Sequence, residues 1–143
     1  MIYYTNSDKE TEAVGEQFGR TVKDGTVVAM YGDLGAGKTA FVRGMARGMG
    51  ITSRVNSPTF TIVNEYRKGN IPLFHFDVYR IESSDEMYDI GWEDYISQGA
   101  IVIVEWATLI EDIFDENIIK IYISKNLDLG EDYREINVEG ITV

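Results

Sequence analysis

Cysteine is absent from this chain of 143 residues, which excludes disulfide bonds and thiolate-bound metals. Long apolar runs are missing too, since none approaches the roughly 20 residues that span a bilayer. The N-terminal segment MIYYTNSDKE has no basic stretch followed by an apolar one, so it lacks the pattern of a secretory signal. From these absences we expect a cytoplasmic protein that makes no contact with membranes.

Basic residues are scarce: 13 lysines and arginines stand against 24 aspartates and glutamates, for a net charge of −11. Binding to a nucleic-acid backbone depends on basic patches and counterion release, so we expect no binding to DNA. If an RNA takes part in the function, another subunit should hold it. The acidic surface suits docking on a basic partner, and equally well serves solubility alone.

The most informative segment that is present is Gly32–Thr39, GDLGAGKT, which matches the phosphate-binding pattern G-x-x-x-x-G-K-[ST] in full. Glycines let such a loop curl so that successive backbone N–H groups point at a polyphosphate. In this pattern Lys38 reaches the β- and γ-phosphates, and the Thr39 hydroxyl ligates Mg²⁺. The helix that begins here adds the positive end of its dipole.

The flanking sequence favours a nucleotide site over an accidental glycine-rich turn. Residues 26–31, TVVAMY, have the length of a buried strand and lead into the loop. Apolar residues then recur every three or four positions through 41–49, as on the buried face of a helix. Strand, loop and helix therefore follow in the required order. We predict that the nucleotide is bound by Gly32, Asp33, Leu34, Gly35, Ala36, Gly37, Lys38, Thr39 and Ala40.

The remaining patterns predict an α/β fold in a single domain, residues 1–143. Capping boxes at Ser7–Glu10 and Ser83–Glu86 each open a helix, the first ending near Gly25. Further strands are expected at 60–66, 73–79, 101–105, 118–123 and 133–138, with a short helix near 109–114. We therefore expect a three-layer helix–sheet–helix sandwich like that of P-loop NTPases, with a mixed, mainly parallel sheet.

Hydrolysis of a bound nucleotide also needs a held metal and a positioned water, and two acids compete for these tasks. Glu105 ends the most hydrophobic strand, where it would face Mg²⁺; the alternative is a strand-end carboxylate in solvent. Asp77 stands between Phe76 and Val78, where burial without a partner is costly. It either has a structural hydrogen-bond partner or, as we favour, orients water or binds the metal indirectly. His75, the only histidine, is interpreted as structural.

Weaker signals lie outside these motifs. Asn56–Phe60 resembles a switch segment in which Thr59 binds the metal only when γ-phosphate is present, although an ordinary loop entering a strand has the same pattern. Arg43 and Arg80 are candidates for sensing γ-phosphate or contacting a partner. Ser124–Asp128 has the letters of a guanine-recognition sequence in the wrong order, so we favour ATP over GTP.

Five segments, in register, resemble the TsaE family, also called YjeE: GDLGAGKT, SPTFTIVNEY (57–66), HFDVYR (75–80), IGWEDY (90–95) and VEW (104–106). The resemblance covers nearly the whole chain. It implies an Mg²⁺-dependent ATPase, weak alone, required for the threonylcarbamoyl modification of adenosine 37 in tRNAs that read ANN codons. Its partners would be TsaB and TsaD. TsaD would transfer the group, the ATPase would reset the complex between turnovers, and tRNA would be reached only through that complex.

The resemblance also implies roles for single residues. Gly35–Thr39 would bind the ATP or ADP phosphates, and Thr39 and Glu105 would ligate Mg²⁺. Hydrolysis would depend on Lys38, Asp77 and Thr59.

Other implied roles concern the base and the partners. Thr11, in the first helix, and Arg134 would flank the base. Trp106 resembles the family's tryptophan near the nucleotide or partner, with a core position as the alternative. Apart from the resemblance, the turn at Trp92–Asp94 is a second candidate for partner contact.

Two other functions stay open on the residues alone. A small-molecule phosphotransferase would need an acceptor pocket and an arginine-rich lid, and the seven arginines of this chain are scattered singly. A nucleotide-dependent switch with negligible turnover is also compatible, because a partner can supply a missing arginine finger.

Overall fold

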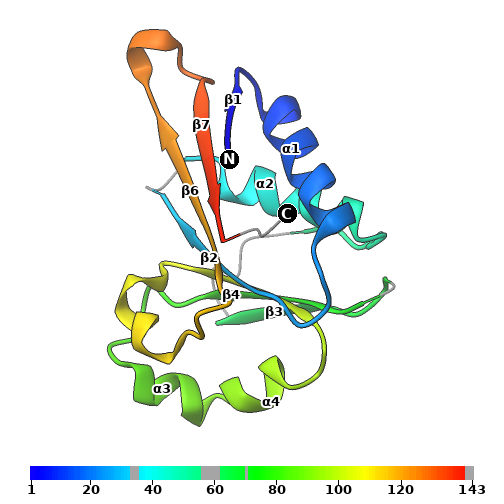
Figure 1. Cartoon of the computed structure of the whole chain (residues 1–143), viewed down its shortest axis with the longest axis vertical. Helices are drawn as coiled ribbons and strands as arrows, with labels where there is room; N and C mark the ends of the chain where they lie inside the picture. The colour runs from blue at the N-terminus through cyan, green and yellow to red at the C-terminus, as the bar shows by residue number, and fades with distance from the viewer. Residues whose placement is uncertain (33–35, 56–61, 70, 141–143) are drawn as a thin grey trace.

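Seven strands form one mixed sheet in the described part of the chain (Figure 1). The structure, a computed structural model, describes residues 1–32, 36–55, 62–69 and 71–140. The strands are β1 (Ile2–Thr5), β2 (Val27–Tyr31), β3 (Val63–Tyr66), β4 (Leu73–Asp77), β5 (Ile101–Glu105), β6 (Ile119–Lys125) and β7 (Arg134–Glu139). Their order in space is β1-β7-β6-β2-β5-β4-β3. β6, β2, β5 and β4 run parallel, and the pairs nearer the edges are antiparallel.

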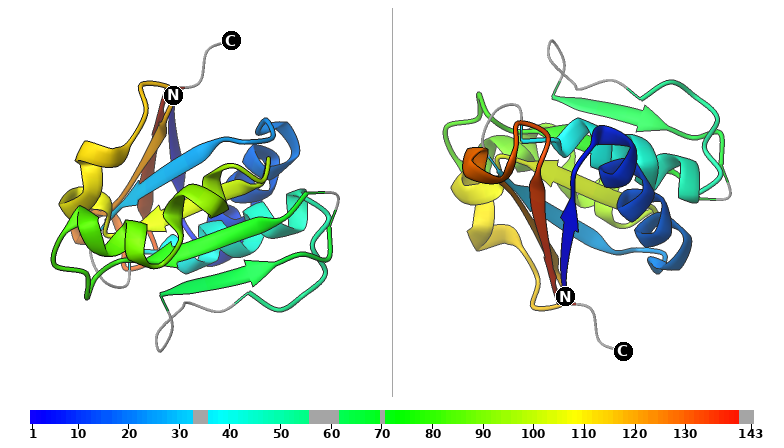
Figure 2. Two further views of the ribbon diagram at one scale, coloured as in Figure 1. Left: turned by 90° about the horizontal axis from the view of Figure 1, so that it is seen from below. Right: turned by 90° about the horizontal axis from the view of Figure 1, so that it is seen from above.

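Helices cover both faces of this sheet (Figure 2). On one side lie α1 (Asp8–Thr21) and α2 (Lys38–Gly48); on the other lie α3 (Ser84–Asp89), α4 (Trp92–Ile96) and the 3₁₀ helix η1 (Ala107–Ile113). A further 3₁₀ turn, η2 (Leu127–Leu129), connects β6 to β7. None of the described helices has the length and apolarity needed to cross a membrane. The expected three-layer α/β sandwich is confirmed.

The central strands supply both halves of the core because their side chains alternate between the two faces. In β2, Val28 and Met30 pack toward α1 and α2, whereas Ala29 packs toward α3 and α4. β5 is buried at all five positions, as expected for a parallel strand that is covered on both faces. The sheet therefore separates two apolar clusters, and its central strands contribute to both.

The first predicted capping box is present, and the second is not formed as expected. The Ser7 hydroxyl accepts a hydrogen bond from the Glu10 backbone N–H at 3.1 Å. Ser83 precedes α3 without a side-chain cap, and Glu86 instead accepts from the backbone N–H of Glu82 at 2.6 Å. A capping sequence at a short helix therefore predicted where the helix begins, although not which atoms cap it.

Three elements were not predicted from the sequence: β1, α4 and η2, which lies where a loop was expected. β1 is a four-residue edge strand that pairs with β7, and its short length gives little periodic signal. α4 has five residues, so a segment expected to be a turn is a helical turn. The strand expected at 60–66 begins at Val63, and residues 56–61 lie outside the described residues.

Helices α1 and α2 are in backbone contact through four glycines. A Cβ atom added at any of them would lie 1.9 to 2.2 Å from a carbonyl oxygen of the facing helix; they are Gly15, Gly19, Gly44 and Gly48. Because no side chain fits there, each glycine is required by the close approach. Ion pairs such as Arg47 Nε to Glu16 Oε2, at 3.0 Å, cross the same helix pair at its exposed edge. This contact fixes the helix that starts at Lys38.

We expect Gly15→Ala to lower the free energy of unfolding by about 1–3 kcal/mol, because its Cβ would lie 2.2 Å from the Phe41 carbonyl oxygen. Gln17→Ala, at an exposed position of the same helix, is the matched control and should change stability by less than about 0.5 kcal/mol. Urea titration of both variants measures the difference. Equal stability of the two variants would show that α1 can move away from α2 to accommodate the added Cβ without loss of folding free energy.

Candidate nucleotide-binding site

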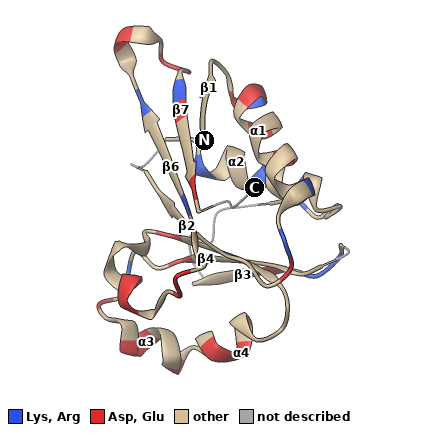
Figure 3. Ribbon diagram, viewed as in Figure 1, with Lys and Arg blue, Asp and Glu red and all other residues tan. Residues whose placement is uncertain are grey.

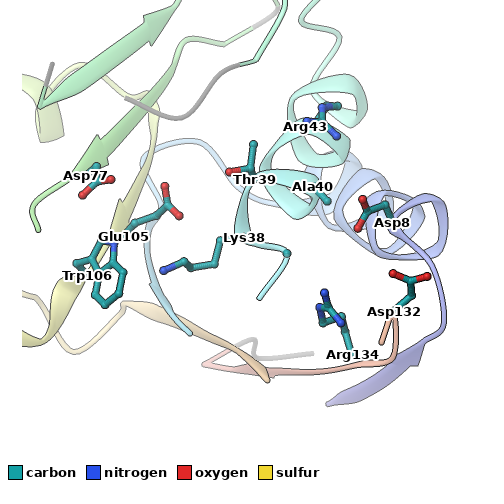
Figure 4. A pocket seen from close by; sticks show the side chains of 11 residues that line it. Asp8, Lys38, Thr39, Ala40, Arg43, Asp77, Glu105, Trp106, Asp132 and Arg134 are labelled. Atoms are coloured by element: carbon teal, nitrogen blue, oxygen red, sulfur yellow. The ribbon is translucent and has the colours of Figure 1, made fainter. Parts of the chain in front are cut away.

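A cavity of about 340 Å³ opens where the carboxyl ends of β4 and β5 meet the N-terminus of α2 (Figure 4). Its lining comes from segments far apart in the sequence: Asp8, Gly37, Lys38, Thr39, Ala40, Arg43, Asp77, Glu105, Trp106, Asp132 and Arg134. Ligands of α/β sheets bind at this edge, outside the carboxyl ends of the parallel strands. The predicted phosphate loop therefore opens onto a cavity that also holds both candidate acids.

The described part of the phosphate loop has the geometry that its glycines permit. Gly37 caps α2 with a φ of +99°, a left-handed conformation that other residues rarely adopt. Its carbonyl oxygen accepts the first helical hydrogen bond, from the Phe41 N–H at 3.0 Å. The start of α2 thus presents backbone N–H groups and the positive end of its dipole to the cavity, an arrangement that favours phosphate.

Lys38 lies inside the cavity, in contact with other groups of the protein. Its Nζ donates a hydrogen bond to the Gly32 carbonyl oxygen at 2.7 Å and lies 4.0 Å from the centroid of the Trp106 ring. The side chain is 7% exposed, so its charge acts where water screens it little. A cation held this way is placed to meet an anionic ligand at the start of α2.

Trp106 takes an unusual backbone conformation directly after β5. Its φ of +60° is the only positive value at a non-glycine position among the described residues. Such a conformation costs energy for a bulky residue and persists only where the surroundings hold it. The ring lines the cavity and packs against the Tyr79 ring at 5.0 Å. Of the two sequence interpretations, the structure therefore favours a site tryptophan over a core one.

Trp92, by contrast, is a core residue and is not itself exposed to a partner, while contact through the rest of the Trp92–Asp94 turn stays a prediction. Its side chain is 2% exposed and packs edge-on against Phe76, with ring centroids 5.4 Å apart. The indole forms the buried, apolar face of α4, and the acidic residues that follow it face solvent. A tryptophan followed by two acids in sequence fits an amphipathic helical turn as well as it fits an exposed turn.

Glu105 is buried at the end of β5, which excludes the alternative of a carboxylate in solvent. Its side chain is 3% exposed, and its Oε2 lies 2.6 Å from the Nε2 atom of His75. In the strand register, Glu105 is opposite Met30 of β2 on one side and Asp77 of β4 on the other. The acid therefore lies beside the strand that leads into the phosphate loop, as the sequence predicted.

Asp77 is half-buried at the end of β4, on the neighbouring strand. Burial raises the pKa of its carboxyl, a hydrogen bond from the Tyr79 backbone N–H to Oδ1 at 3.0 Å lowers it, and the Glu105 carboxylate raises it again; the net direction is upward. Asp77 thus has a structural hydrogen bond and also lines the cavity, while its role toward water or metal stays a prediction.

The donors around the cavity fit Mg²⁺ bound together with a nucleotide. Mg²⁺ prefers oxygen ligands and commonly takes one or two from the protein, with the rest from water and phosphate. The Thr39 hydroxyl and the Glu105 carboxylate both line the cavity, and Figure 4 shows Glu105 directed into it between Asp77 and Thr39. Among the described residues no group of three or more histidine, aspartate or glutamate side chains could hold a metal alone. The cavity therefore suits a metal that arrives with phosphate.

The far end of the cavity is lined by residues that the motif analysis only partly predicted. Arg134 donates from Nε to the Ala36 carbonyl oxygen at 2.8 Å, and so connects β7 to the phosphate loop. Asp8 and Asp132 line the same end and were missed, since neither belongs to a nucleotide-binding motif; Asp8 lies inside the first capping box. Thr11 is 1% exposed and lies behind Gly37, with its hydroxyl 2.8 Å from that of Thr5. Its contact with a base stays a prediction.

The comparisons with known proteins agree with the motifs. A family model described as "Threonylcarbamoyl adenosine biosynthesis protein TsaE" matches residues 5–136. The chain belongs to the TsaE family. The tRNA threonylcarbamoyladenosine biosynthesis protein TsaE of Bacillus subtilis (strain 168) is 44% identical over 141 residues, which cover 99% of this chain and 86% of that protein. Its namesake from Treponema pallidum (strain Nichols) is 35% identical over 138 residues, covering 96% and 99%.

A solved structure also matches this chain. The crystal structure of YdiB from Bacillus subtilis has a TM-score of 0.80 at 38% identity, over 95% of this chain and 82% of that one. The resemblance to the TsaE family and the expected fold class are thus both confirmed.

Several predicted residues of this family member lie elsewhere or cannot be placed. Gly32 and Ala36 line a neighbouring hollow with Tyr31 and Tyr122. Asp33, Leu34, Gly35 and Thr59 lie outside the described residues. Arg43 lines the cavity, while Arg80 is exposed and does not.

We expect Arg134→Ala to lower the free energy of unfolding by about 1–3 kcal/mol, because the buried Ala36 carbonyl loses its hydrogen-bond donor. Arg67→Ala removes the same charge near the opposite edge of the sheet, where the ion pair with Glu65 is exposed. It should cost less than about 1 kcal/mol. Denaturant titration of the two variants gives the comparison, and an equal loss in both would argue against a special role for Arg134.

Proposed function

We propose that this TsaE-family protein is an Mg²⁺-dependent ATPase that acts with TsaB and TsaD in forming the threonylcarbamoyl group on adenosine 37 of tRNAs reading ANN codons. Family membership supports a role in threonylcarbamoyladenosine biosynthesis. The observation that carries the ATPase proposal is the convergence of Lys38, Thr39, Asp77 and Glu105 on one cavity at the start of α2. This arrangement combines a phosphate-binding helix start, a cation and two acids, which are the groups that phosphoryl transfer needs.

The residues divide the work by position. The start of α2 and Lys38 bind the phosphates of ATP, and Thr39 and Glu105 would hold Mg²⁺, which would supply neutralisation of phosphate charge. Asp77 orients the attacking water from the neighbouring strand. Burial raises the pKa of the Asp77 carboxyl above that of an ordinary aspartate. A carboxylate with a raised pKa is a better proton acceptor during the reaction.

The distribution of charge supports the proposed dependence on partners. The first turns of α3 and α4 carry acidic residues, and neither helix contains a lysine or an arginine (Figure 3). Such a surface repels tRNA and attracts a basic protein surface, so the RNA is held by the partner complex.

We expect substitutions of the two acids to act differently. Glu105→Gln should raise the Mg²⁺ concentration needed for nucleotide binding at least tenfold, because a charged ligand is lost. Asp77→Asn should leave binding intact and slow hydrolysis about 100-fold or more, because the water-orienting base is lost. Lys38→Ala should abolish binding. Titration of a fluorescent ADP at varied Mg²⁺, with phosphate release, measures both effects.

Asp89→Asn is the control for these variants, since it removes an exposed carboxylate on α3 outside the cavity. It should behave as the wild type in both assays. Normal hydrolysis by Asp77→Asn would remove Asp77 from the mechanism. An unchanged Mg²⁺ requirement in Glu105→Gln would remove Glu105 from the metal site.

We expect hydrolysis to be slow in the isolated protein and to rise when TsaB and TsaD are added together. Purified components assayed for phosphate release test this, and tRNA nucleosides from depleted cells should lose threonylcarbamoyladenosine. A rate unaffected by the partners would favour a nucleotide-dependent switch. A phosphorylated metabolite in place of free phosphate would favour a phosphotransferase.

A further inference from the structure

A buried histidine contacts the acid of the candidate metal site. His75, on β4, is fully buried, and its Nε2 lies 2.6 Å from Oε2 of Glu105, which is 3% exposed. Among the described residues, the Glu105 side chain makes no hydrogen bond other than this one. An ionised carboxylate can only accept a hydrogen bond, so the chemistry of the pair assigns the proton to Nε2 of His75.

The strand register explains why these two side chains meet. β4 and β5 are parallel neighbours, with His75 opposite Ile103 and Asp77 opposite Glu105. Alternation places His75 and Glu105 on the same face of the sheet as Leu73 and Ile103, the face that α2 covers. The imidazole is therefore fixed beneath the start of α2 by the sheet itself. It cannot move without disturbing the core.

Within the described part of the chain, the second ring nitrogen of His75 lacks a hydrogen-bond partner, so the surrounding core does not explain why a histidine stands at this position. Nδ1 is buried and has no hydrogen-bond partner among the described residues. Burial of an unpaired polar atom costs free energy, and a phenylalanine or leucine would fill the same space without that cost. The contact with Glu105 is the polar interaction that distinguishes histidine from an apolar residue at this position.

We propose that His75 is a positioning residue for the metal site, an inference that rests on the proposed role of Glu105 in binding Mg²⁺. The Nε2–H of His75 holds one carboxylate oxygen of Glu105 from the buried side. The carboxylate is then kept in one orientation and directed into the cavity toward Thr39 (Figure 4). Hydrogen-bond partners of metal ligands commonly act in this way, and their loss weakens metal binding roughly 10- to 100-fold.

The test compares two substitutions with Glu105→Gln. His75→Phe keeps a buried aromatic ring and removes the donor, so the Mg²⁺ concentration needed for half-maximal tightening of ADP binding should rise roughly 10- to 100-fold. ADP binding in EDTA should stay unchanged. His75→Gln keeps an N–H donor near the position of Nε2 and should restore most of the Mg²⁺ dependence. Rescue by glutamine separates a positioning role from a packing role, because glutamine packs less well than phenylalanine in an apolar core.

The Glu105→Gln arm separates this inference from the proposed function. If Glu105→Gln changes the Mg²⁺ requirement and His75→Phe does not, the positioning role is wrong and the metal assignment stands. If neither variant changes it, the metal assignment itself fails.

A measurement on the unmodified protein covers the case in which His75→Phe does not fold. His75 is the only histidine, so ¹⁵N-histidine labelling gives the signals of one imidazole. We expect a protonated Nε2 whose resonance shifts when Mg²⁺ is added to the ADP-bound protein, and shifts much less with ADP in EDTA. An Nε2 signal that is unprotonated, or that Mg²⁺ leaves in place, would overturn the proposal.

Discussion

The parallel pairing of β4, β5 and β2 is the constraint on which the candidate site depends. Parallel strands end at the same edge of a sheet, so residues that are far apart in sequence arrive side by side. Asp77 ends β4, Glu105 ends β5, and the phosphate loop follows β2. The helix that starts at Lys38 is then held in place from outside by α1, through glycines that allow backbone contact. Either acid would lie far from the loop if its own strand were inserted elsewhere in the sheet.

The interior of the site shows how burial and charge are balanced. Lys38, Glu105 and His75 are all nearly or fully buried, and each makes a polar contact with a neighbour. Buried charges are costly unless they are paired or bind a ligand, so a site of this kind is shaped for an ionic ligand and not for stability alone. Trp106, which has a left-handed backbone, contributes to the same balance, because its indole packs against the Lys38 ammonium group.

The acidic exterior and the cationic interior serve different purposes. A net charge of −11 opposes binding of tRNA at the surface, while Lys38 and the start of α2 offer a local positive field for a polyphosphate. These effects act over different ranges, since exposed charges are screened within a Debye length and the buried lysine is screened much less. A protein can therefore bind ATP while leaving the nucleic acid to its partners.

The local motif by itself determined the strand–loop–helix unit around Lys38, because glycine conformation, apolar periodicity and capping are properties of neighbouring residues. The apolar run at 101–105 also placed Glu105 at a strand end, whereas Asp77 was expected inside a strand at 73–79 and proved to be the last residue of β4. Only the tertiary structure decided that His75 bonds Glu105, that Trp92 is buried, and that Asp8 and Asp132 line the cavity. Strand order, register and the helix against which a face packs set these contacts. They depend on pairings between distant segments, for which no short stretch of sequence carries a signal.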